Sequence, residues 1–406
     1  MPSSPVTLTM WVTADGIQKV SVEKVAKEYT AKHPNITIKV EEFPFLDLHD
    51  KLRIALQAGS GAPDVAYVEI SRFGSLLKGS EPALVDLSCL LQPVTPNLIP
   101  ARQNNYTYQG KVYGAEGCAC PVELYYRADI FQQLGIATPI KTWDEYLADA
   151  KTIKAKSGKN MIAIETTDYD VWTPLMLQYG GGFFDKDGKV ILDSPQNLKA
   201  FQWLVDLVQK YKVAIPAPGG DQYNPTFWGA YQKGDIVSIW GADWMASILT
   251  GFVPGMKGQW KAQPLPTGPD APWATSTVGG TAMVIIKQSA NAAAAWDWMQ
   301  FLYINRPPDT SAGTPGSLTN NKTFWADPAY HTGAPYFGGQ KIGELWIDQA
   351  NILFQPGAPY LNPDPNNPTA YDIFTRAALG PAIRGEKTAE EALKAAADEL
   401  RSTVAP

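Results

Sequence analysis

The chain has 406 residues, 45% apolar and 18% charged, which is enough for two or three folded units and too apolar for a disordered chain. Its 40 acidic and 34 basic residues leave a formal net charge of −6 without any run of Lys or Arg. This balance excludes a nucleic-acid partner. No apolar stretch approaches the roughly 20 residues that cross a bilayer, and the start of the chain lacks the basic and apolar regions of a secretory signal.

The first seventy residues predict a β-α-β-α-β order. Residues 6–12 alternate apolar and polar side chains, as a strand does, and the apolar spacing over 22–29 is helical. A second alternating segment covers 36–43, and Leu residues at helical spacing follow over 48–56. The apolar run at 65–68 lies between turn residues, which is typical of a buried parallel strand.

The remainder of the chain alternates in the same way. It predicts strands at 124–127, 161–165, 236–240 and 282–286, and helices at 143–155, 172–179, 195–210, 292–303 and 389–401. This alternation favours an α/β fold with mostly parallel sheets.

Motifs of catalysis and of cofactor binding are absent from the sequence. It has no G-x-S-x-G elbow, no phosphate-binding G-x-x-x-x-G-K-[ST] loop and no H-E-x-x-H pair. Residues 185–188 resemble the start of a calcium loop but lack its later acidic ligands, so they predict a plain hairpin turn. We therefore expect no catalytic residue, no metal and no cofactor.

Cysteine and aromatic residues leave alternatives open. Cys118 and Cys120 are two residues apart on a predicted strand, and Cys89 lies in an apolar segment, so buried thiols or one disulfide involving Cys89 are both possible.

The 13 Trp, 18 Tyr and 14 Phe exceed what most cores need. We expect four to six of these rings in a binding site and the others in the core.

Six segments in a fixed order resemble extracellular solute-binding proteins of carbohydrate-uptake ABC transporters, the maltose-binding-protein-like group. They are LTMWVTADG with the following PNITIKVEEF to VAYV, KVYGAEG with ELYYRADIFQQLGI and KTWDEY, QYGGGFF to KVAIP, YQKGDIVSIWGADW, GGTAMVI, and GEKTAEEALKAAADEL. Each motif is short, and it is their order over nearly the whole chain that carries the resemblance.

This resemblance implies a two-lobed periplasmic-binding-protein fold of type II with a ligand cleft between the lobes. The first lobe would comprise residues 1–115 and 278–304, and the second 116–277 and 305–406. Such a protein binds a neutral sugar or oligosaccharide, closes by hinge motion and delivers the ligand to the permease subunits of an ABC transporter. We expect a monomer that acts in the periplasm or outside the cell, free or as a lipoprotein, with its export signal removed from this sequence.

Ligands of open α/β sheets bind at the carboxyl ends of strands, so most candidate ligand-binding residues are those that directly follow a predicted strand. The other candidates lie at the start of a predicted helix or in glycine turns. The full set is Trp11, Asp15, Glu69, Ser71, Arg72, Glu116, Asp170, Trp172, Trp240, Asp243, Trp244, Gly279, Gly280 and Trp346. Trp240 or Trp244 is the preferred plate for stacking a sugar ring. Trp11 and Trp346 could equally belong to the core, Arg72 could form a structural ion pair, and an Asp before Trp172 could cap a helix.

Two other functions use similar residues. A glycoside hydrolase also combines tryptophans with two carboxylates about 5–9.5 Å apart, but nothing in the sequence marks such a pair. A binder of peptides or phosphate esters would need several cations in the cleft, and only Arg72 is placed for that role. We therefore predict a sugar-binding protein and not an enzyme.

Overall fold

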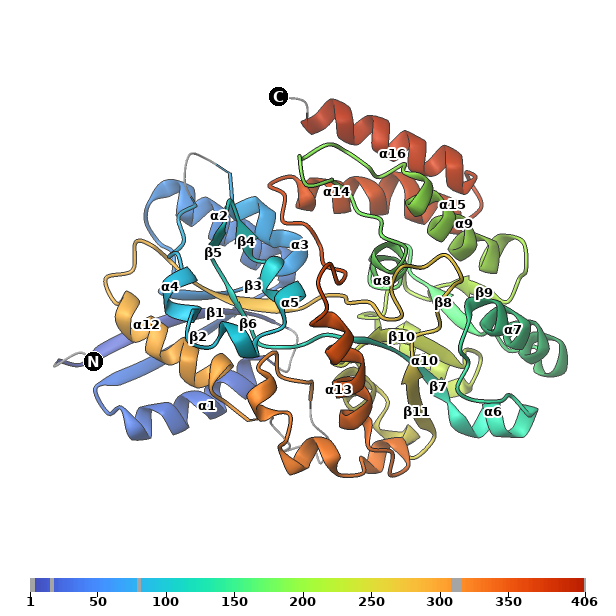
Figure 1. Ribbon diagram of the computed structural model, residues 1–406, viewed down its shortest axis with the longest axis horizontal. Helices are drawn as coiled ribbons and strands as arrows, with labels where there is room; N and C mark the ends of the chain where they lie inside the picture. The colour runs from blue at the N-terminus through green and yellow to red at the C-terminus, as the bar shows by residue number, and fades with distance from the viewer. Residues whose placement is uncertain (1–3, 15–17, 79–81, 308–315, 405–406) are drawn as a thin grey trace.

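The computed structural model describes residues 4–14, 18–78, 82–307 and 316–404, and its strands form two main sheets on opposite sides of the molecule (Figure 1). The first sheet has the order β2-β1-β3-β12-β6. Its strands are β1 (Val6–Thr13), β2 (Ile36–Phe43), β3 (Val65–Glu69), β6 (Ala115–Glu116) and β12 (Thr281–Ile285). Strands β2 and β3 pair with β1 in parallel, whereas β12 runs antiparallel to β3 and β6.

The second sheet is antiparallel, and β7 lies between β10 and β11. The strands on this side are β7 (Val122–Arg127), β8 (Ile162–Ile164), β9 (Ala214–Pro216), β10 (Ser238–Ala242) and β11 (Trp260–Pro264). Strand β8 pairs in parallel with β9, and a bridge from Asn160 to Ile236 connects it to the segment before β10. A small hairpin of β4 (Thr107–Tyr108) and β5 (Lys111–Val112) belongs to the first side.

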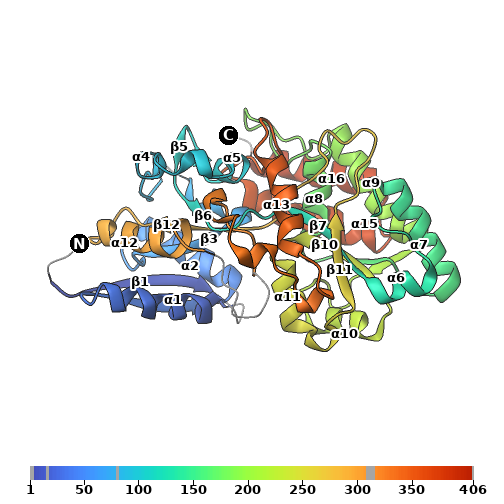
Figure 2. The same ribbon diagram turned by 60° about the horizontal axis from the view of Figure 1, so that its bottom comes forward.

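Helices surround both sheets (Figures 1 and 2). Those near the first sheet are α1 (Gln18–Lys32), α2 (Phe45–Ala58), α3 (Ile70–Phe73), α4 (Ser88–Leu91), α5 (Pro100–Asn104) and α12 (Ala292–Met299). Those near the second are α6 (Ala128–Leu134), α7 (Trp143–Ser157), α8 (Trp172–Gln178), α9 (Pro195–Gln209), α10 (Pro225–Lys233), α11 (Met245–Phe252), α13 (Ile342–Leu353), α14 (Asn367–Phe374), α15 (Gly380–Ile383) and α16 (Ala389–Val404). None of the helices in the described ranges is both long and apolar enough to cross a bilayer.

Local sequence explains where several helices begin and end. Thr142 and Glu145 form a reciprocal capping box at the start of α7, which satisfies backbone N–H groups that have no partner within the helix. Gly59 ends α2 with a φ of 71°, a left-handed conformation that glycine adopts without steric penalty. These signals are short-range, and they explain why the helix boundaries could be anticipated from the sequence.

The chain passes between the two sheets three times, and the passages are bonded to one another. After β6, residues 117–121 lead into β7, residues 276–280 return to β12, and the chain leaves again after α12. Cys118 bridges to Thr319 and Pro121 bridges to Thr277, both in antiparallel fashion. The first passage is thus hydrogen-bonded to both of the others, and we refer to these passages between the two sheets as the hinge.

The structure confirms the predicted α/β architecture and the order β-α-β-α-β of the first seventy residues. Parallel pairing is found in the centre of the first sheet and between β8 and β9, whereas the second sheet is antiparallel. Residues 185–188 form the expected turn, in which the Gly188 N–H donates to the Asp185 carbonyl. The helices α6, α10, α11, α13, α14 and α15 and the short helices α3, α4 and α5 were not predicted.

Candidate functional site

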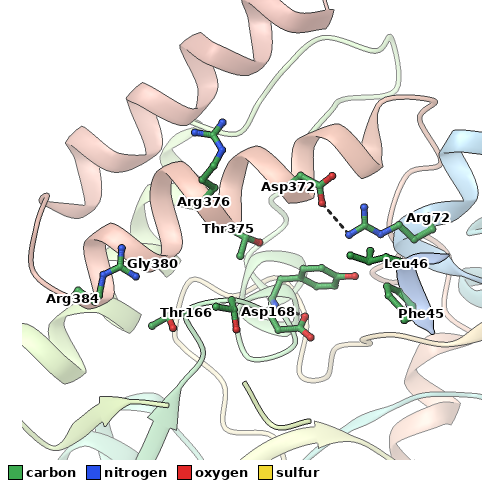
Figure 3. Close-up of a pocket in the computed structure, with 12 residues that line it drawn as sticks. Phe45, Leu46, Arg72, Thr166, Asp168, Asp372, Thr375, Arg376, Gly380 and Arg384 are labelled. Carbon is green, nitrogen blue, oxygen red and sulfur yellow. Dashed lines mark hydrogen bonds and ion pairs between the residues drawn. The ribbon is translucent and has the colours of Figure 1, made fainter. Parts of the chain in front are cut away.

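A pocket of about 580 Å³ lies between the two lobes (Figure 3). Helices α2 and α3 of the first lobe form one wall, and the segment after β8 together with α14 and α15 of the second lobe forms the others. The lining residues are Phe45, Leu46, Arg72, Thr166, Thr167, Asp168, Tyr169, Asp372, Thr375, Arg376, Gly380 and Arg384. This pocket is the candidate ligand site, because sites of this kind are concave and lie between lobes.

The end of β3 supplies the first-lobe side of the site. Glu69 is the last residue of the strand, and its carboxylate accepts hydrogen bonds from the backbone N–H (2.7 Å) and the hydroxyl of Ser71. The Glu69 N–H donates to Nε2 of His49 (3.1 Å), whose Nδ1 therefore donates to the Phe45 carbonyl (2.7 Å). These bonds fix the start of α2, and with it Phe45, against the end of the strand.

Two polar contacts join this strand end to the second lobe. The Tyr169 hydroxyl donates to the Ser71 hydroxyl oxygen at 2.5 Å. Nearby, Nη2 of Arg72 donates to Oδ1 of Asp372 on α14 at 3.0 Å (Figure 3). Because each contact needs one residue from each lobe, both can form only when the lobes are close together.

Buried carboxylates hold the segment after β8 in place. Glu165 accepts from the backbone N–H groups of Val171 (3.0 Å) and Gln222 (3.4 Å). Asp170 accepts from the Gln222 amide (2.6 Å) and the Tyr223 hydroxyl (3.0 Å). Since both carboxylates anchor neighbours of Tyr169, that ring has a fixed position at the pocket.

Tyr169 also has an aromatic partner. Its ring lies 3.9 Å from the ring of Tyr371, centroid to centroid, at an interplanar angle of 36°. Tyr371 is buried in the second lobe, so its ring supports Tyr169 from behind. The free face of this ring suits the apolar face of a ligand. The hydroxyl, carboxylate and guanidinium groups around it suit a polar rim on the same ligand.

Burial changes the protonation of the acidic groups here. It raises the pKa of Glu69 to about 7, although the hydrogen bonds from Ser71 oppose the shift. It raises the pKa of Asp170 to about 6, against the hydrogen bonds from Tyr223 and Gln222. Burial and the charge of Asp170 also raise the pKa of Asp168. Near pH 7 the Glu69 carboxyl can therefore donate as well as accept hydrogen bonds, whereas most of Asp170 remains an ionised acceptor.

The sequence of the chain matches a protein family and several known proteins. Residues 14–306 match the family model described as "Bacterial extracellular solute-binding protein". The chain is also 30% identical to the arabinooligosaccharide-binding protein of Bacillus subtilis (strain 168), over 98% of this chain and 93% of that protein. This chain belongs to the bacterial extracellular solute-binding protein family.

Other relatives extend the comparison. This solute-binding protein is 26% identical to the lactose-binding protein of Rhizobium radiobacter, over 98% of this chain and 93% of that one. Its fold resembles that of the ABC transporter-associated binding protein from B. animalis subsp. lactis Bl-04, solved with β-1,6-galactobiose, with a TM-score of 0.78 at 23% identity over 98% of both chains. The predicted two-lobed fold and family membership are thereby confirmed.

Four predicted site tryptophans of this solute-binding protein are core residues, which corrects their assignment to the cleft. Trp240 packs against Trp143, with 5.2 Å between ring centroids, and donates its indole N–H to the Val171 carbonyl. Trp172 is buried against Phe374 of α14. The other two are also buried: Trp11 donates to Glu41, and Trp346 lies on α13 inside the second lobe. None of the four lines the pocket.

Glu116 and the paired glycines belong to the hinge and not to the pocket. Glu116 forms a buried ion pair with Arg102, which also contacts Thr277 and donates to the Gly279 carbonyl (2.7 Å). Burial raises the pKa of Glu116 to about 7, whereas the Arg102 charge opposes the shift. Gly280 has a φ of 108°, and a Cβ there would overlap Glu116 and Arg102. The glycine therefore leaves room for this ion pair against the backbone of the second passage.

Asp243 and Trp244 contact the hinge as well. Asp243 is fully buried and accepts from the backbone N–H groups of Leu318 (2.7 Å) and Trp244 (2.8 Å). Burial raises its pKa to about 7, opposed by these backbone donors. Trp244 is half-buried beside Gly279, and its indole N–H lies 3.4 Å from the Val278 carbonyl. Neither residue lines the pocket. Asp15 lies outside the described residues.

The cysteines differ from one sequence-based expectation. Cys118 and Cys120 form a disulfide within the first hinge passage, and Cys89 is free and exposed. A buried or disulfide-bonded Cys89 was therefore a wrong prediction. Among the described residues, Glu116, Cys118 and Cys120 are a group whose potential metal-ligand atoms lie within 4.8 Å of one another. Because both sulfurs are bonded to each other and Glu116 is paired with Arg102, they form no ready metal site.

Of the residues predicted from the sequence, Arg72 lines the pocket, and Glu69 and Ser71 lie next to the lining residue Tyr169 through the hydrogen bond of Ser71; their role in ligand binding stays a prediction. Sequence reasoning missed most of the lining residues, including Phe45, Tyr169 and the whole face of α14 and α15. A signal existed for that face, because Asp372, Arg376, Gly380 and Arg384 are spaced four residues apart. Two aromatic rings line the pocket, Phe45 and Tyr169, fewer than the four to six expected.

Proposed function

We propose that this protein binds a neutral sugar or oligosaccharide in the pocket between its lobes and delivers it to the permease of an ABC transporter. The observation that carries the proposal is the pocket lining, in which a supported tyrosine ring lies among hydroxyl, carboxylate and guanidinium groups from both lobes. An aromatic face suits the C–H face of a sugar ring, and the polar groups suit its hydroxyls. Relatives named for arabinooligosaccharides and lactose support this substrate class.

Closure of the lobes is the mechanism that we propose for ligand capture. The lobes would be residues 1–115 with 278–304 and residues 116–277 with 305–406. The contacts from Tyr169 to Ser71 and from Arg72 to Asp372 form only when the lobes meet, so they favour the closed state. A ligand that touches both walls adds to this preference, and that differential affinity shifts the population.

We further propose that the protein acts as a monomer, in the periplasm or outside the cell, and leaves its ligand unchanged. A glycoside hydrolase would require two carboxyl groups positioned around the scissile bond. Asp168 and Asp372 line the pocket, but Asp372 is paired with Arg72. This pairing favours binding over acid catalysis.

A calorimetric screen tests the function. We expect saturable heat with at least one neutral sugar from a panel of arabino-, galacto- and malto-oligosaccharides and their monosaccharides, and recovery of the sugar intact afterwards. Heat with phosphate esters or peptides but with no neutral sugar would overturn the proposal. Release of shorter sugars from the bound ligand would instead support the hydrolase alternative.

Replacement of Tyr169 by alanine should weaken sugar binding by about 2–4 kcal/mol, or roughly 30- to 700-fold, as for a buried aromatic anchor. The Tyr169→Phe variant keeps the ring and loses only the hydrogen bond to Ser71, so we expect a loss of about tenfold or less. Calorimetry at a temperature where all variants are folded measures both. The control is Tyr211→Ala, because Tyr211 contacts Lys151 and Lys210 away from the pocket. If the Tyr169→Ala variant binds sugar with the affinity of the wild-type chain, the Tyr169 ring does not contact the ligand.

A further inference from the structure

The first hinge passage changes its bonding partner at Cys120. Before this residue, Cys118 forms an antiparallel bridge with Thr319 of the third passage. After it, Pro121 forms one with Thr277 of the second passage, and the Thr277 hydroxyl donates to the Cys120 carbonyl at 3.0 Å. Hinge motion is absorbed by the backbone angles of a few residues. Cys120 is the residue at which the second and third passages can move relative to each other.

The backbone is bent at this point. Cys120 has a φ of 49°, a left-handed conformation that is unfavourable for a residue with a Cβ. The Cα atoms of Cys118 and Cys120 are 5.4 Å apart, whereas two steps along an extended strand span roughly 6.4–6.8 Å. The disulfide between the two side chains joins the ends of this bend and holds it.

This disulfide contributes little to the stability of the whole fold. The stabilisation that a disulfide provides increases with the length of the loop that it closes. The two cysteines are two positions apart in the sequence, so the closed loop comprises only Cys118, Ala119 and Cys120. The covalent bond therefore acts mainly on the bend, and on the hydrogen bonds that neighbouring residues form across the hinge.

The disulfide can be attacked by a soluble reductant at Cys118, because Cys118 is half-buried whereas Cys120 is fully buried. The thiolate of a small dithiol bonds to the sulfur of Cys118, the S–S bond breaks, and its electron pair passes to the sulfur of Cys120. A carboxyl oxygen of Glu116 lies within 4.8 Å of both sulfurs, and its negative charge disfavours a second one, so Cys120 takes up a proton. The second thiol of the reductant then displaces Cys118, which also becomes a thiol, and the reductant leaves as a cyclic disulfide.

We infer that the Cys118–Cys120 disulfide is a redox-active site that fixes the hinge, and that reduction by a small dithiol releases it. In the oxidised chain the bend at Cys120 is held covalently. In the reduced chain Cys120 can leave the left-handed conformation, and the hydrogen bonds to the second and third passages open more often. The inference goes beyond the proposed function, because it concerns the hinge and requires no ligand.

Hydrogen exchange with and without dithiothreitol tests the inference on the intact chain. A Cys89→Ser background removes the other thiol, so trapping with iodoacetamide under native conditions should count no free thiol before reduction and two after it. The backbone N–H groups of Ala119, Val122 and Asn320 donate to carbonyls across the hinge. After reduction they should exchange roughly 5- to 30-fold faster, which corresponds to the left-handed penalty of about 1–2 kcal/mol at 1.4 kcal/mol per tenfold. The N–H groups of β1 should exchange at unchanged rates.

A matched pair of variants tests the role of the bend itself. Cys118→Ala with Cys120→Ala has no disulfide and keeps a Cβ at position 120, so its hinge N–H groups should exchange as in the reduced chain. Cys118→Ala with Cys120→Gly lacks only one more methyl group and adopts the φ of 49° without penalty, so it should recover most of the protection. Neither variant should respond to dithiothreitol. Thermal denaturation shows whether they are folded, and the comparison of oxidised with reduced chain requires neither of them.

Several results would contradict the inference. If excess dithiothreitol leaves the disulfide intact in the folded chain, the site is not redox-active. If two thiols appear while exchange across the hinge is unchanged, or if the Ala and Gly variants exchange equally fast, the bond does not act on the bend. If β1 and the hinge gain exchange equally, the disulfide stabilises the whole fold and not the hinge. Because no ligand is present, none of these results bears on sugar binding.

Discussion

Replacing Arg102 by methionine is expected to lower the free energy of unfolding by about 3–5 kcal/mol at neutral pH, because it leaves a buried carboxylate without its partner. The side chains of Arg102 and Glu116 are 0% and 1% exposed, so water cannot replace the lost contact. The guanidinium also contacts Thr277 and donates to the Gly279 carbonyl. One side chain therefore joins the end of β6, just before the first passage, to the second passage.

The loss should depend on pH in a defined direction. Burial already raises the pKa of Glu116 in the folded protein, and removing the Arg102 charge raises it further. The folded variant then takes up a proton that the unfolded chain, with an ordinary Glu pKa, releases. The destabilisation relative to the wild-type chain should accordingly be largest near pH 8, decrease as the pH falls to about 7, the pKa of Glu116 in the wild-type fold, and change little from there to pH 5. Chemical denaturation at these three pH values measures the differences.

Two further variants make this result specific. Arg306→Met removes the partly exposed partner of Glu28 and should change stability by less than about 1 kcal/mol. The double variant Arg102→Met with Glu116→Leu should recover much of the loss, since an apolar pair replaces the unpaired charge. If Arg102→Met proves as harmless as Arg306→Met, the buried pair contributes nothing to the hinge.

The second large effect is expected for Trp240→Ala, which should lower the free energy of unfolding by about 3–5 kcal/mol, as truncation of core aromatic residues does. Trp240 is 1% exposed, and its ring packs near Trp143, Tyr146 and Trp203. Thermal and chemical denaturation measure the loss. Trp244→Ala is the matched comparison, because Trp244 is only half-buried and should lose less stability.

Ligand binding separates core from site in the same experiment. At a temperature where Trp240→Ala is folded, its affinity for sugar should stay within about tenfold of that of the wild-type chain. A small effect is expected, because the indole N–H bonds the Val171 carbonyl, two residues after Tyr169. If Trp240→Ala is as stable as the wild-type chain but no longer binds sugar, Trp240 is a ligand-binding residue and not a core residue.

The tryptophans show where sequence reasoning fails. Period-2 alternation distinguishes an inner from an outer face only when one face of a strand is exposed, and every residue of β10 is buried. The position of Trp240 in the alternating pattern of β10 therefore could not show whether its side chain lies in the cleft or in the core. Trp346 was placed in irregular sequence, but buried residues recur at helical spacing along α13, and this periodicity was overlooked.

The strand order near the N-terminus and the position of Arg72 were predictable, because both depend on patterns within a few residues. The other pocket wall was not predictable in this way. Helix α14 lies three hundred residues after Arg72 in the sequence, and the contact between Arg72 and Asp372 depends on the folding of both lobes. Local propensity carries no information about such a pairing, whereas the four-residue spacing along α14 and α15 does indicate a shared face.

The cysteine arrangement has a practical consequence for watching this molecule move. Cys89 is an exposed free thiol on α4, and the other two cysteines are bonded to each other. A maleimide dye should therefore attach at one position on the first lobe without prior mutagenesis. A second cysteine in place of the exposed Ser402 on α16 would add a label on the other lobe. Energy transfer between the two dyes could then follow opening and closing in single molecules.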